Sequence, residues 1–387
     1  MQLKKPYQEK KGTNMPKTKI QELAELGQSV WLDSISRSMI ETGKLKEMIN
    51  SGLRGMTSNP TIFDNAISSG NDYDEEMKRL HGMEKSTFGI YDDLTVRDIQ
   101  DAADLFKHVY EKTSGLDGYV SLEINPKLAF KTEETIKEGK RLYEKVGRPN
   151  VMFKVPSTDA GFGAIEELLS EGINVNITLI FSLEQYEKTA HAFLRGMKRL
   201  LKNKGDLSRV SSVASVFVSR IDTAIDRIID EKITKEQNED IKTRLRSLRG
   251  KAAVANSETI FKKYTEIFSG KDFEQLKDNG ARVQRVLWGS TGTKDPDYSD
   301  IKYVTELIGN PTVNTLPQKT IDAFLDHGIC KEALTENVKE AEETIEALKS
   351  YGIDINVICA KLLDEGVISF EKSFDSLLNT IEAKNRG

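Results

Sequence analysis

The feature that most constrains the fold of this chain is the alternation of short β-favouring runs with longer helical patterns. Eight such runs occur in order, and most end on or just before a polar residue: Ser29–Asp33, Leu53–Thr57, Tyr119–Glu123, Val151–Val155, Ile173–Ile177, Ser211–Phe217, Arg285–Trp288 and Thr312–Thr315. Strands that alternate with helices form βαβ units and a parallel sheet. Eight of them predict an α/β fold of the closed (β/α)8 TIM-barrel type, with an open doubly wound sheet as the alternative.

The helical patterns between the runs are amphipathic. Leu183–Leu201 and Ile221–Ile233 both repeat apolar residues at three- and four-residue steps, which predicts one buried face on each helix. Two connections, Phe63 to Gly118 and Ile221 to Arg282, are longer than a barrel needs. We therefore expect helical insertions at both places.

Length alone suggests two or three domains, because the chain has 387 residues. A barrel accounts for roughly 250 residues by itself, however. We predict an N-terminal tail and lead-in helix over 1–28, one catalytic barrel over 29–325, and a helical extension over 326–387 that packs on the barrel. The extension has an apolar face formed by Leu334, Val338, Ala341, Ile345 and Leu348.

Charge and hydropathy exclude several classes of protein. The chain carries 56 Lys and Arg against 61 Asp and Glu, so it lacks the basic excess of a general nucleic-acid binder. A hydrophobic content of 38% is too high for a disordered chain. No apolar run approaches the roughly 20 residues that a membrane helix needs. We expect neither nucleic acid nor membrane as a partner.

The N-terminal segment and the cysteines indicate a cytoplasmic protein. The Lys-rich segment Met1–Lys19 precedes no apolar core, so it is expected to be a disordered tail rather than a secretory signal, and Met15 is a possible true start. Only Cys330 and Cys359 occur, which fits a reducing compartment. The four histidines show no ligand spacing, so we expect no metal site built on His or Cys.

Polar residues accumulate where the predicted strands end. In a (β/α)8 barrel, catalytic side chains lie at the carboxyl ends of several strands. Polar groups that point into the top of a barrel lose hydration unless they are paired, so such a set indicates a functional site. Its members here are Asp33, Asn59, Glu123, Lys154, Asn176, Thr178, Ser215, Arg220 and Ser290.

Lys154 is the most informative of these residues. It lies in the apolar run Val151–Val155, which Pro156 follows, and lysine is almost never fully buried without a partner. Burial of an amine favours its neutral form, which can attack a carbonyl carbon. The alternative is a lysine at a strand end that reaches solvent or pairs with a carboxylate.

Two carboxylates on other strands fit the same chemistry. Glu123 is either an ion-pair partner of Lys154 or a proton shuttle for forming and hydrolysing an imine. Asp33 suits the second proton transfer, at a substrate hydroxyl, as a carbon–carbon bond breaks. Alternatively, Asp33 caps a helix, because Ser34 and Ser36 follow it in a plausible turn.

Two cations indicate a phosphate site. Arg220 ends the segment Ser215–Arg220, and Lys294 ends the Gly- and hydroxyl-rich loop Gly289–Lys294. Backbone N–H groups in such a loop can cradle a phosphate. The loop is not a Walker A motif, because its glycine and lysine order differs.

Six segments, in order, resemble the transaldolase family, and in particular its longer bacterial and plant-type members. The resemblance covers roughly residues 20–330 and continues in helical form to the end. Its specificity comes from the set, since no single segment would carry it. The segments are Thr57–Phe63, Lys154–Thr158, Asn176–Ser182, Ser215–Arg220, Trp288–Lys294 and Thr312–Pro317.

The resemblance implies a class I aldolase barrel, circularly permuted so that the Schiff-base lysine falls on the fourth strand. It implies reversible transfer of a dihydroxyacetone unit from sedoheptulose 7-phosphate to glyceraldehyde 3-phosphate, which gives erythrose 4-phosphate and fructose 6-phosphate in the pentose phosphate pathway. No metal or organic cofactor is implied.

The resemblance also implies roles for the catalytic residues. Lys154 would be the nucleophile, and Asp33 the acid and base at the substrate hydroxyl. Glu123 and Thr178 would hold the water that carries protons during imine formation.

The remaining implied roles concern substrate binding. Asn59 and Asn176 would hold the dihydroxyacetone hydroxyls, and Ser215 would line the same pocket with Phe217 and Ser290. Arg220 would bind the phosphate. Many transaldolases carry a second arginine in the loop after the seventh strand, where this chain has Lys294. A lysine is a point charge without the bidentate fork of arginine.

Two other functions stay open at the level of sequence. One is a related Schiff-base aldolase that releases free dihydroxyacetone. The other is a catalytically silent barrel that only binds sugar phosphates, which the joint presence of Lys154, Glu123 and Asp33 argues against. The expected partners are small sugar phosphates, and the expected assembly is a monomer or a homodimer.

Overall fold

The computed structural model describes residues 16–386. The expected tail up to residue 15 and the alternative start at Met15 lie outside this range.

Eight parallel strands close into one barrel in the order β1 to β8, with β8 pairing with β1. The predicted barrel is confirmed, and the open doubly wound sheet is wrong. The strands are β1 Gln28–Asp33, β2 Gly55–Thr57, β3 Tyr119–Glu123, β4 Val151–Pro156, β5 Val175–Ile180, β6 Ser212–Phe217, β7 Arg285–Gly289 and β8 Thr312–Leu316.

Strand β5 departs most from the expectation. The apolar pattern predicted Ile173–Ile177, but the strand runs over Val175–Ile180. Its pairing with β6 shifts between Ile177 and Ile180, and Leu179 within that shift has a φ of +60°. A bulge inserts an extra residue into a strand, which the alternation of apolar and polar residues does not predict. Thr178 therefore lies inside the strand instead of beyond its end.

The strand register brings the predicted polar residues to one level. Glu123 on β3 pairs with Lys154 on β4, and Lys154 pairs with Asn176 on β5. Asp33 on β1 pairs with Thr57 on β2. Since the strands are parallel, these positions share the carboxyl end of the barrel, where catalytic residues of this fold lie.

The barrel interior below that level is filled with large apolar side chains. This layer consists of Trp31, Tyr119, Met152, Val213, Leu287 and Val313. Gly55 makes room for Trp31, because a Cβ at Gly55 would lie 2.6 Å from the indole ring. The layer separates the top of the barrel from the lower end, where a second cavity of about 330 Å³ lies beside Met152 and Val213.

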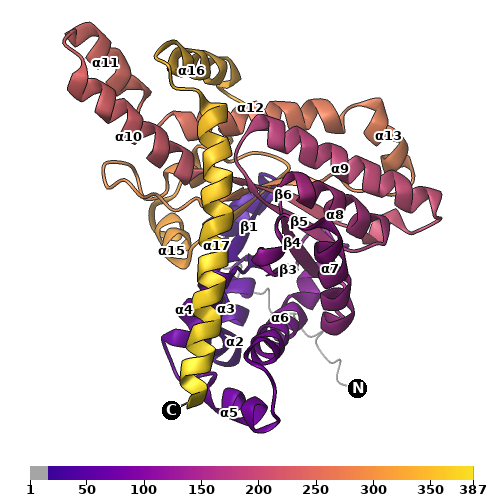
Figure 1. Ribbon diagram of the computed structural model, residues 1–387. Helices are drawn as coiled ribbons and strands as arrows, with labels where there is room; N and C mark the ends of the chain where they lie inside the picture. Colours follow the sequence, from indigo (N-terminus) through magenta and orange to yellow (C-terminus); the bar gives the residue numbers. More distant parts are fainter. Residues whose placement is uncertain (1–15, 387) are drawn as a thin grey trace, which may run out of the picture.

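Helices surround the barrel and fill both long connections (Figure 1). Between β2 and β3 the chain forms α4 Pro60–Ser68, α5 Asp74–Gly82 and α6 Thr87–Lys112. Between β6 and β7 it forms α10 Ser219–Lys235, α11 Glu239–Leu248, α12 Ala252–Phe268 and α13 Lys271–Asp278. The other helices are α1 Lys19–Glu25, α2 Arg37–Glu41, α3 Lys44–Asn50, α7 Thr132–Val146, α8 Asp159–Ser170, α9 Leu183–Lys202, α14 Lys302–Thr305 and α15 Gln318–His327, with 3-10 turns η1 Pro126–Leu128 and η2 Leu207–Arg209.

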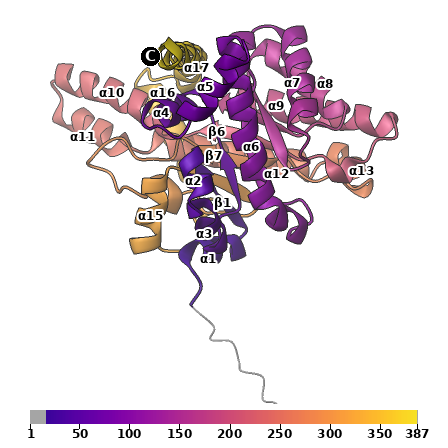
Figure 2. The same cartoon turned by 90° about the horizontal axis from the view of Figure 1, so that it is seen from below.

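The C-terminal region contains α16 Val338–Ser350 and α17 Ile355–Arg386. Helix α16 packs on α12, and Leu334 lies before it, so the predicted apolar helix face is one turn shorter than expected. Helix α17 packs against α4, α6 and α10. It crosses the front of the molecule in Figure 1 and is seen nearly end-on in Figure 2. The division of the chain at 28/29 and 325/326 stays a prediction.

Within residues 16–386, the structure contains no helix that is both long and apolar enough to cross a membrane.

Candidate active site

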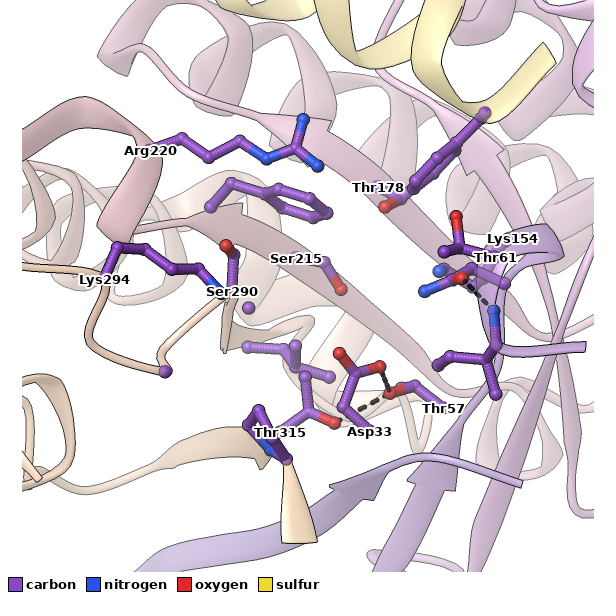
Figure 3. A pocket seen from close by; sticks show the side chains of 18 residues that line it. Asp33, Thr57, Thr61, Lys154, Thr178, Ser215, Arg220, Ser290, Lys294 and Thr315 are labelled. Carbon is purple, nitrogen blue, oxygen red and sulfur yellow. Dashed lines mark hydrogen bonds between the residues drawn. The ribbon is translucent and has the colours of Figure 1, made fainter. Parts of the chain in front are cut away.

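A cavity of about 290 Å³ opens at the carboxyl end of the strands. All the residues predicted for the site line it except Glu123 and Asn176. Figure 3 shows Lys154 and Thr178 on one side, Arg220 and Lys294 on the other, and Asp33 and Ser215 between them. The cavity therefore offers a nucleophile at one end and two cations at the other.

Lys154 is buried beside a carboxylate. Its side chain is 6% exposed, and its Nζ lies 2.8 Å from Glu123 Oε2. The same Nζ donates a hydrogen bond of 3.1 Å to the backbone oxygen of Ser58. Burial raises the pKa of Glu123, while the charge of Lys154 and its hydrogen bond oppose that shift. The pair combines a buried amine with a carboxyl group whose raised pKa favours its protonated form.

Asp33 belongs to a second proton-carrying unit. Thr57 Oγ1 donates to Asp33 Oδ1 over 2.7 Å, and Thr57 Oγ1 lies 2.7 Å from Thr315 Oγ1. Because the Thr57 proton points to Asp33, Thr315 is the donor in the second bond. Burial raises the pKa of Asp33, and the positive charge of Lys154, the Thr57 hydrogen bond and Lys294 oppose it. The helix-cap alternative for Asp33 is wrong, since Ser36 caps α2.

Thr178 presents an unsatisfied hydroxyl to the cavity. It is fully buried, and its Oγ1 has no hydrogen-bond partner among the described residues. A buried polar atom without a partner is uncommon, and a bound water or ligand is one usual explanation. The bulge at Leu179 places this hydroxyl, and Ser157 Oγ fixes the bulge by donating to the Leu179 oxygen over 2.9 Å.

The two asparagines differ in position. Asn59 lines the cavity and caps α4, because its Oδ1 accepts from the Ile62 N–H over 3.0 Å. Its binding of a substrate hydroxyl stays a prediction. Asn176 is fully buried behind the wall, where Ser215 Oγ donates to its Oδ1 over 2.6 Å. Its Nδ2 donates to Ser121 over 3.0 Å. In this arrangement Asn176 fixes Ser215, and its direct contact with a substrate hydroxyl stays a prediction.

The cationic end is formed by two neighbouring segments. The Arg220 guanidinium lies 5.7 Å from the centre of the Phe217 ring, a cation–π distance. No carboxylate lies within ion-pair distance of Arg220 or Lys294 in the described part of the chain. The two segments are joined, since Ser219 N–H donates to the Ser290 oxygen over 3.0 Å. Two unpaired cations beside one cavity favour an anionic ligand.

The sequence interpretation missed several residues of the wall. Thr57 and Thr315 lie in segments already singled out, so their position at strand ends was an available signal. Phe370 comes from α17, and no local pattern links that helix to the cavity. The additional lining residues are Thr57, Thr61, Ile62, Leu287, Gly289, Gly292, Thr315, Pro317 and Phe370. No group of three or more His, Cys, Asp or Glu side chains within residues 16–386 could hold a metal ion.

Comparison with known proteins agrees with this geometry. The model of the transaldolase/fructose-6-phosphate aldolase family matches residues 30–381. The chain belongs to this family. Transaldolase relatives cover almost the whole chain, and that of Trichodesmium erythraeum is 45% identical over 94% of this chain and 96% of its own. Those of Saccharopolyspora erythraea and Thiobacillus denitrificans are each 43% identical, over 94% and 93% of this chain and 96% and 98% of theirs.

The family match extends further than the six motifs. The motifs end at Pro317, but the transaldolase family model continues to residue 381. It therefore includes most of α17 and, with it, Phe370. The C-terminal helix belongs to the part of the chain that the family shares.

Proposed function

We propose that this chain is a transaldolase that moves a dihydroxyacetone unit from sedoheptulose 7-phosphate to glyceraldehyde 3-phosphate, giving erythrose 4-phosphate and fructose 6-phosphate. One observation carries the proposal. Lys154 is a buried amine paired with Glu123, and it faces a cavity whose far end holds Arg220 and Lys294. A ketose phosphate needs a nucleophile for its carbonyl and cations for its phosphate.

The first half of the proposed reaction forms an imine. The Lys154 amine attacks the ketose carbonyl carbon and gives a carbinolamine, which loses water. That loss needs a proton for the leaving oxygen. We assign this proton transfer to Glu123 and to a water held by the free hydroxyl of Thr178. Burial supports this role for Glu123, because it raises the carboxyl pKa.

The second half breaks and re-forms a carbon–carbon bond. Asp33 takes the proton from the substrate hydroxyl, the aldehyde departs, and three carbons remain on Lys154 as an enamine. The enamine carbon then attacks the carbonyl carbon of the acceptor aldehyde, and Asp33 returns a proton to the new alkoxide. Hydrolysis of the imine frees the product and restores the amine. No external oxidant or reductant is needed.

Trapping the intermediate tests the mechanism. With fructose 6-phosphate, cleavage releases glyceraldehyde 3-phosphate, and protonation of the remaining enamine gives a three-carbon iminium on Lys154. Borohydride is expected to reduce this iminium and leave a three-carbon adduct on the peptide that contains Lys154. Lys154→Arg should give no adduct, while Lys294→Ala, which keeps the nucleophile, should still give it. An adduct on another lysine, or turnover by Lys154→Arg, would contradict the assignment.

The alternative is an aldolase that releases free dihydroxyacetone. An assay with fructose 6-phosphate, in the presence and absence of erythrose 4-phosphate, separates the two activities. A transaldolase forms sedoheptulose 7-phosphate and releases little dihydroxyacetone. An aldolase releases dihydroxyacetone at the same rate with or without the acceptor.

We further propose a cytoplasmic location and a monomeric or dimeric assembly. The two cysteines are free thiols, which fits a reducing compartment. Cell fractionation tests the location, and light scattering on a sizing column tests the assembly.

A further inference from the structure

One face of α17 covers the catalytic side of the barrel mouth. Gly366, Phe370 and Phe374 stand four residues apart, so they lie one above another on the same face of the helix. Phe370 and Phe374 are buried, at 5% and 1% exposure, whereas Ile368 of the same helix is 49% exposed. The buried face, not the helix as a whole, meets the site.

Phe370 lies at the nucleophile. Its ring centre is 5.7 Å from Lys154 Nζ, and the ring forms part of the cavity wall. Among the described lining residues, it is the one that α17 supplies. The ring places apolar surface where solvent would otherwise reach the amine.

Two contacts hold α17 on either side of Phe370. A Cβ at Gly366 would lie 2.9 Å from Leu179 Cδ2, so the helix rests directly on the bulge beside Thr178. One turn beyond Phe370, the Phe374 ring packs edge-on against Tyr91 of α6, with 5.1 Å between the ring centres. The backbone that carries Phe370 is thus held by one contact on each side, which keeps this face of α17 turned to the cavity.

We propose that Phe370 is the residue that keeps water from the three-carbon intermediate on Lys154. It thereby makes transfer of this unit to an acceptor aldehyde faster than its release as free dihydroxyacetone. The inference rests on the proposed transaldolase function. A single side chain of α17 would then determine whether the intermediate is transferred or hydrolysed.

The two fates use the same atoms differently. In transfer, the enamine carbon forms a bond to the aldehyde carbon of the acceptor. In release, that carbon takes a proton, water adds to the resulting iminium carbon, and the carbon–nitrogen bond to Lys154 breaks. Free dihydroxyacetone leaves and the amine is restored. Release consumes one water and no redox partner, so the access of water to the iminium carbon decides its rate.

The test compares Phe370→Ala with Phe370→Leu and with Ile368→Ala as a matched control on the exposed face. Fructose 6-phosphate is supplied with saturating erythrose 4-phosphate, and free dihydroxyacetone is measured against sedoheptulose 7-phosphate. We expect the ratio of release to transfer to rise about tenfold in Phe370→Ala, which corresponds to about 1.4 kcal/mol between the two barriers. Phe370→Leu keeps the apolar cover and should restore a ratio near that of the wild type, as should Ile368→Ala.

Other outcomes overturn the proposal. If Phe370→Ala lowers both rates by the same factor, the ring has only a structural role. Gly366→Leu provides a second test should Phe370→Ala fail to fold, since a Cβ at Gly366 already lies 2.9 Å from Leu179 Cδ2 and a long side chain there must displace α17 from the bulge. An unchanged ratio in a folded Gly366→Leu would then contradict the proposal. If the wild type itself transfers nothing to erythrose 4-phosphate, the proposed function fails instead, so the two failures are distinguishable.

Discussion

At the scale of single residues, the site is a set of buried polar groups whose partners determine their chemistry. Lys154 forms an ion pair with Glu123, and Asp33 accepts a hydrogen bond from Thr57. The Thr178 hydroxyl has no hydrogen-bond partner among the described residues. The two pairs suit the two proton transfers of the proposed reaction, one during imine formation and one at the substrate hydroxyl. The residue types at the strand ends were readable from the sequence, but their pairing was not, because it depends on the strand register.

Glu123→Gln should remove the proton shuttle and keep the shape of the side chain. General acid–base catalysis contributes roughly 10²- to 10⁴-fold, so imine formation should slow by about that factor. The rate of borohydride trapping with fructose 6-phosphate measures it. Glu171→Gln, which removes a carboxylate from an exposed ion pair with Lys140, is the control. Trapping at the wild-type rate in Glu123→Gln would remove Glu123 from the role.

Arg220→Ala should weaken the binding of phosphorylated ketoses. A hydrogen bond to a charged group contributes about 1.5–3 kcal/mol, which corresponds to a rise in KM of roughly 10- to 150-fold for fructose 6-phosphate. The rate with free dihydroxyacetone as donor should change far less. Lys294→Ala should show the same pattern with a smaller rise, because lysine lacks the bidentate geometry. Equal losses with both donors would contradict the phosphate assignment.

At the scale of elements, the loop that carries Lys294 is anchored to α10. Tyr298 Oη donates to Asp226 and Tyr303 Oη to Asp222, each over 2.8 Å. Since Arg220 is the second residue of α10, the two cations are positioned by one helix and its tyrosine anchors. The sequence predicted the helix and the loop separately, and nothing in either pattern indicates that they are joined.

Element boundaries also show where sequence patterns stop being informative. Seven strands lie within two residues of their predicted bounds, because β-branched runs and strand ends coincide. Strand β5 begins two residues and ends three residues later than predicted. Leu179 within it has a positive φ, a conformation that favours glycine, so a leucine at this position gives no sign of the bulge. The position of Phe370 was equally hidden, because it depends on where α17 packs.

The contact between α12 and α16 should depend on pH. Glu258 of α12 is 5% exposed, and burial, with Glu340 and Glu306 nearby, raises its pKa to about 7. Lys251 lines the same small cavity, and Lys302 is paired with Glu306. The folded state thus holds this proton more tightly than the unfolded state, whose glutamate titrates at about 4.3. This contribution to stability is present at low pH and is lost as the pH rises toward 7.

Glu258→Gln should therefore raise the Tm above that of the wild type at pH 8, and the difference should shrink toward pH 5. Thermal unfolding at several pH values measures it. Glu343→Gln removes a carboxylate from an exposed pair on α16 and should show no comparable trend. A pH-independent difference for Glu258→Gln would contradict the assignment.

At the scale of the whole molecule, the two ends of the barrel have separate tasks. The top carries the candidate active site, and the bottom carries a buried ion pair in which Arg285 of β7 lies 2.8 Å from Asp117. Ser29 of β1 joins them by donating to Asp117 over 2.9 Å. These contacts connect the first and seventh strands, so they contribute to closing the barrel. The closed architecture itself was predictable, since eight βα units leave few other arrangements.

Asp117→Asn should destabilise the barrel by about 3–5 kcal/mol, because it leaves the buried charge of Arg285 without a partner. Chemical denaturation measures the loss. The kcat of the folded fraction should not change, since the substitution lies at the opposite end of the strands from the site. Glu111→Gln, in an exposed pair with Lys107, should cost at most about 1 kcal/mol. A loss of kcat without a loss of stability would show that the two ends are coupled.

The place of Phe370 in the chain has a consequence for biosynthesis. Synthesis reaches the end of β8 at Leu316 more than fifty residues before it reaches Phe370. A nascent chain can therefore close its barrel, and assemble Lys154 with Glu123, while the cover is still inside the ribosome. During that interval the amine lacks the apolar cover that the Phe370 ring provides. The finished enzyme differs from this intermediate in the segment that follows β8, in which α17 brings the Phe370 ring to the reactive amine.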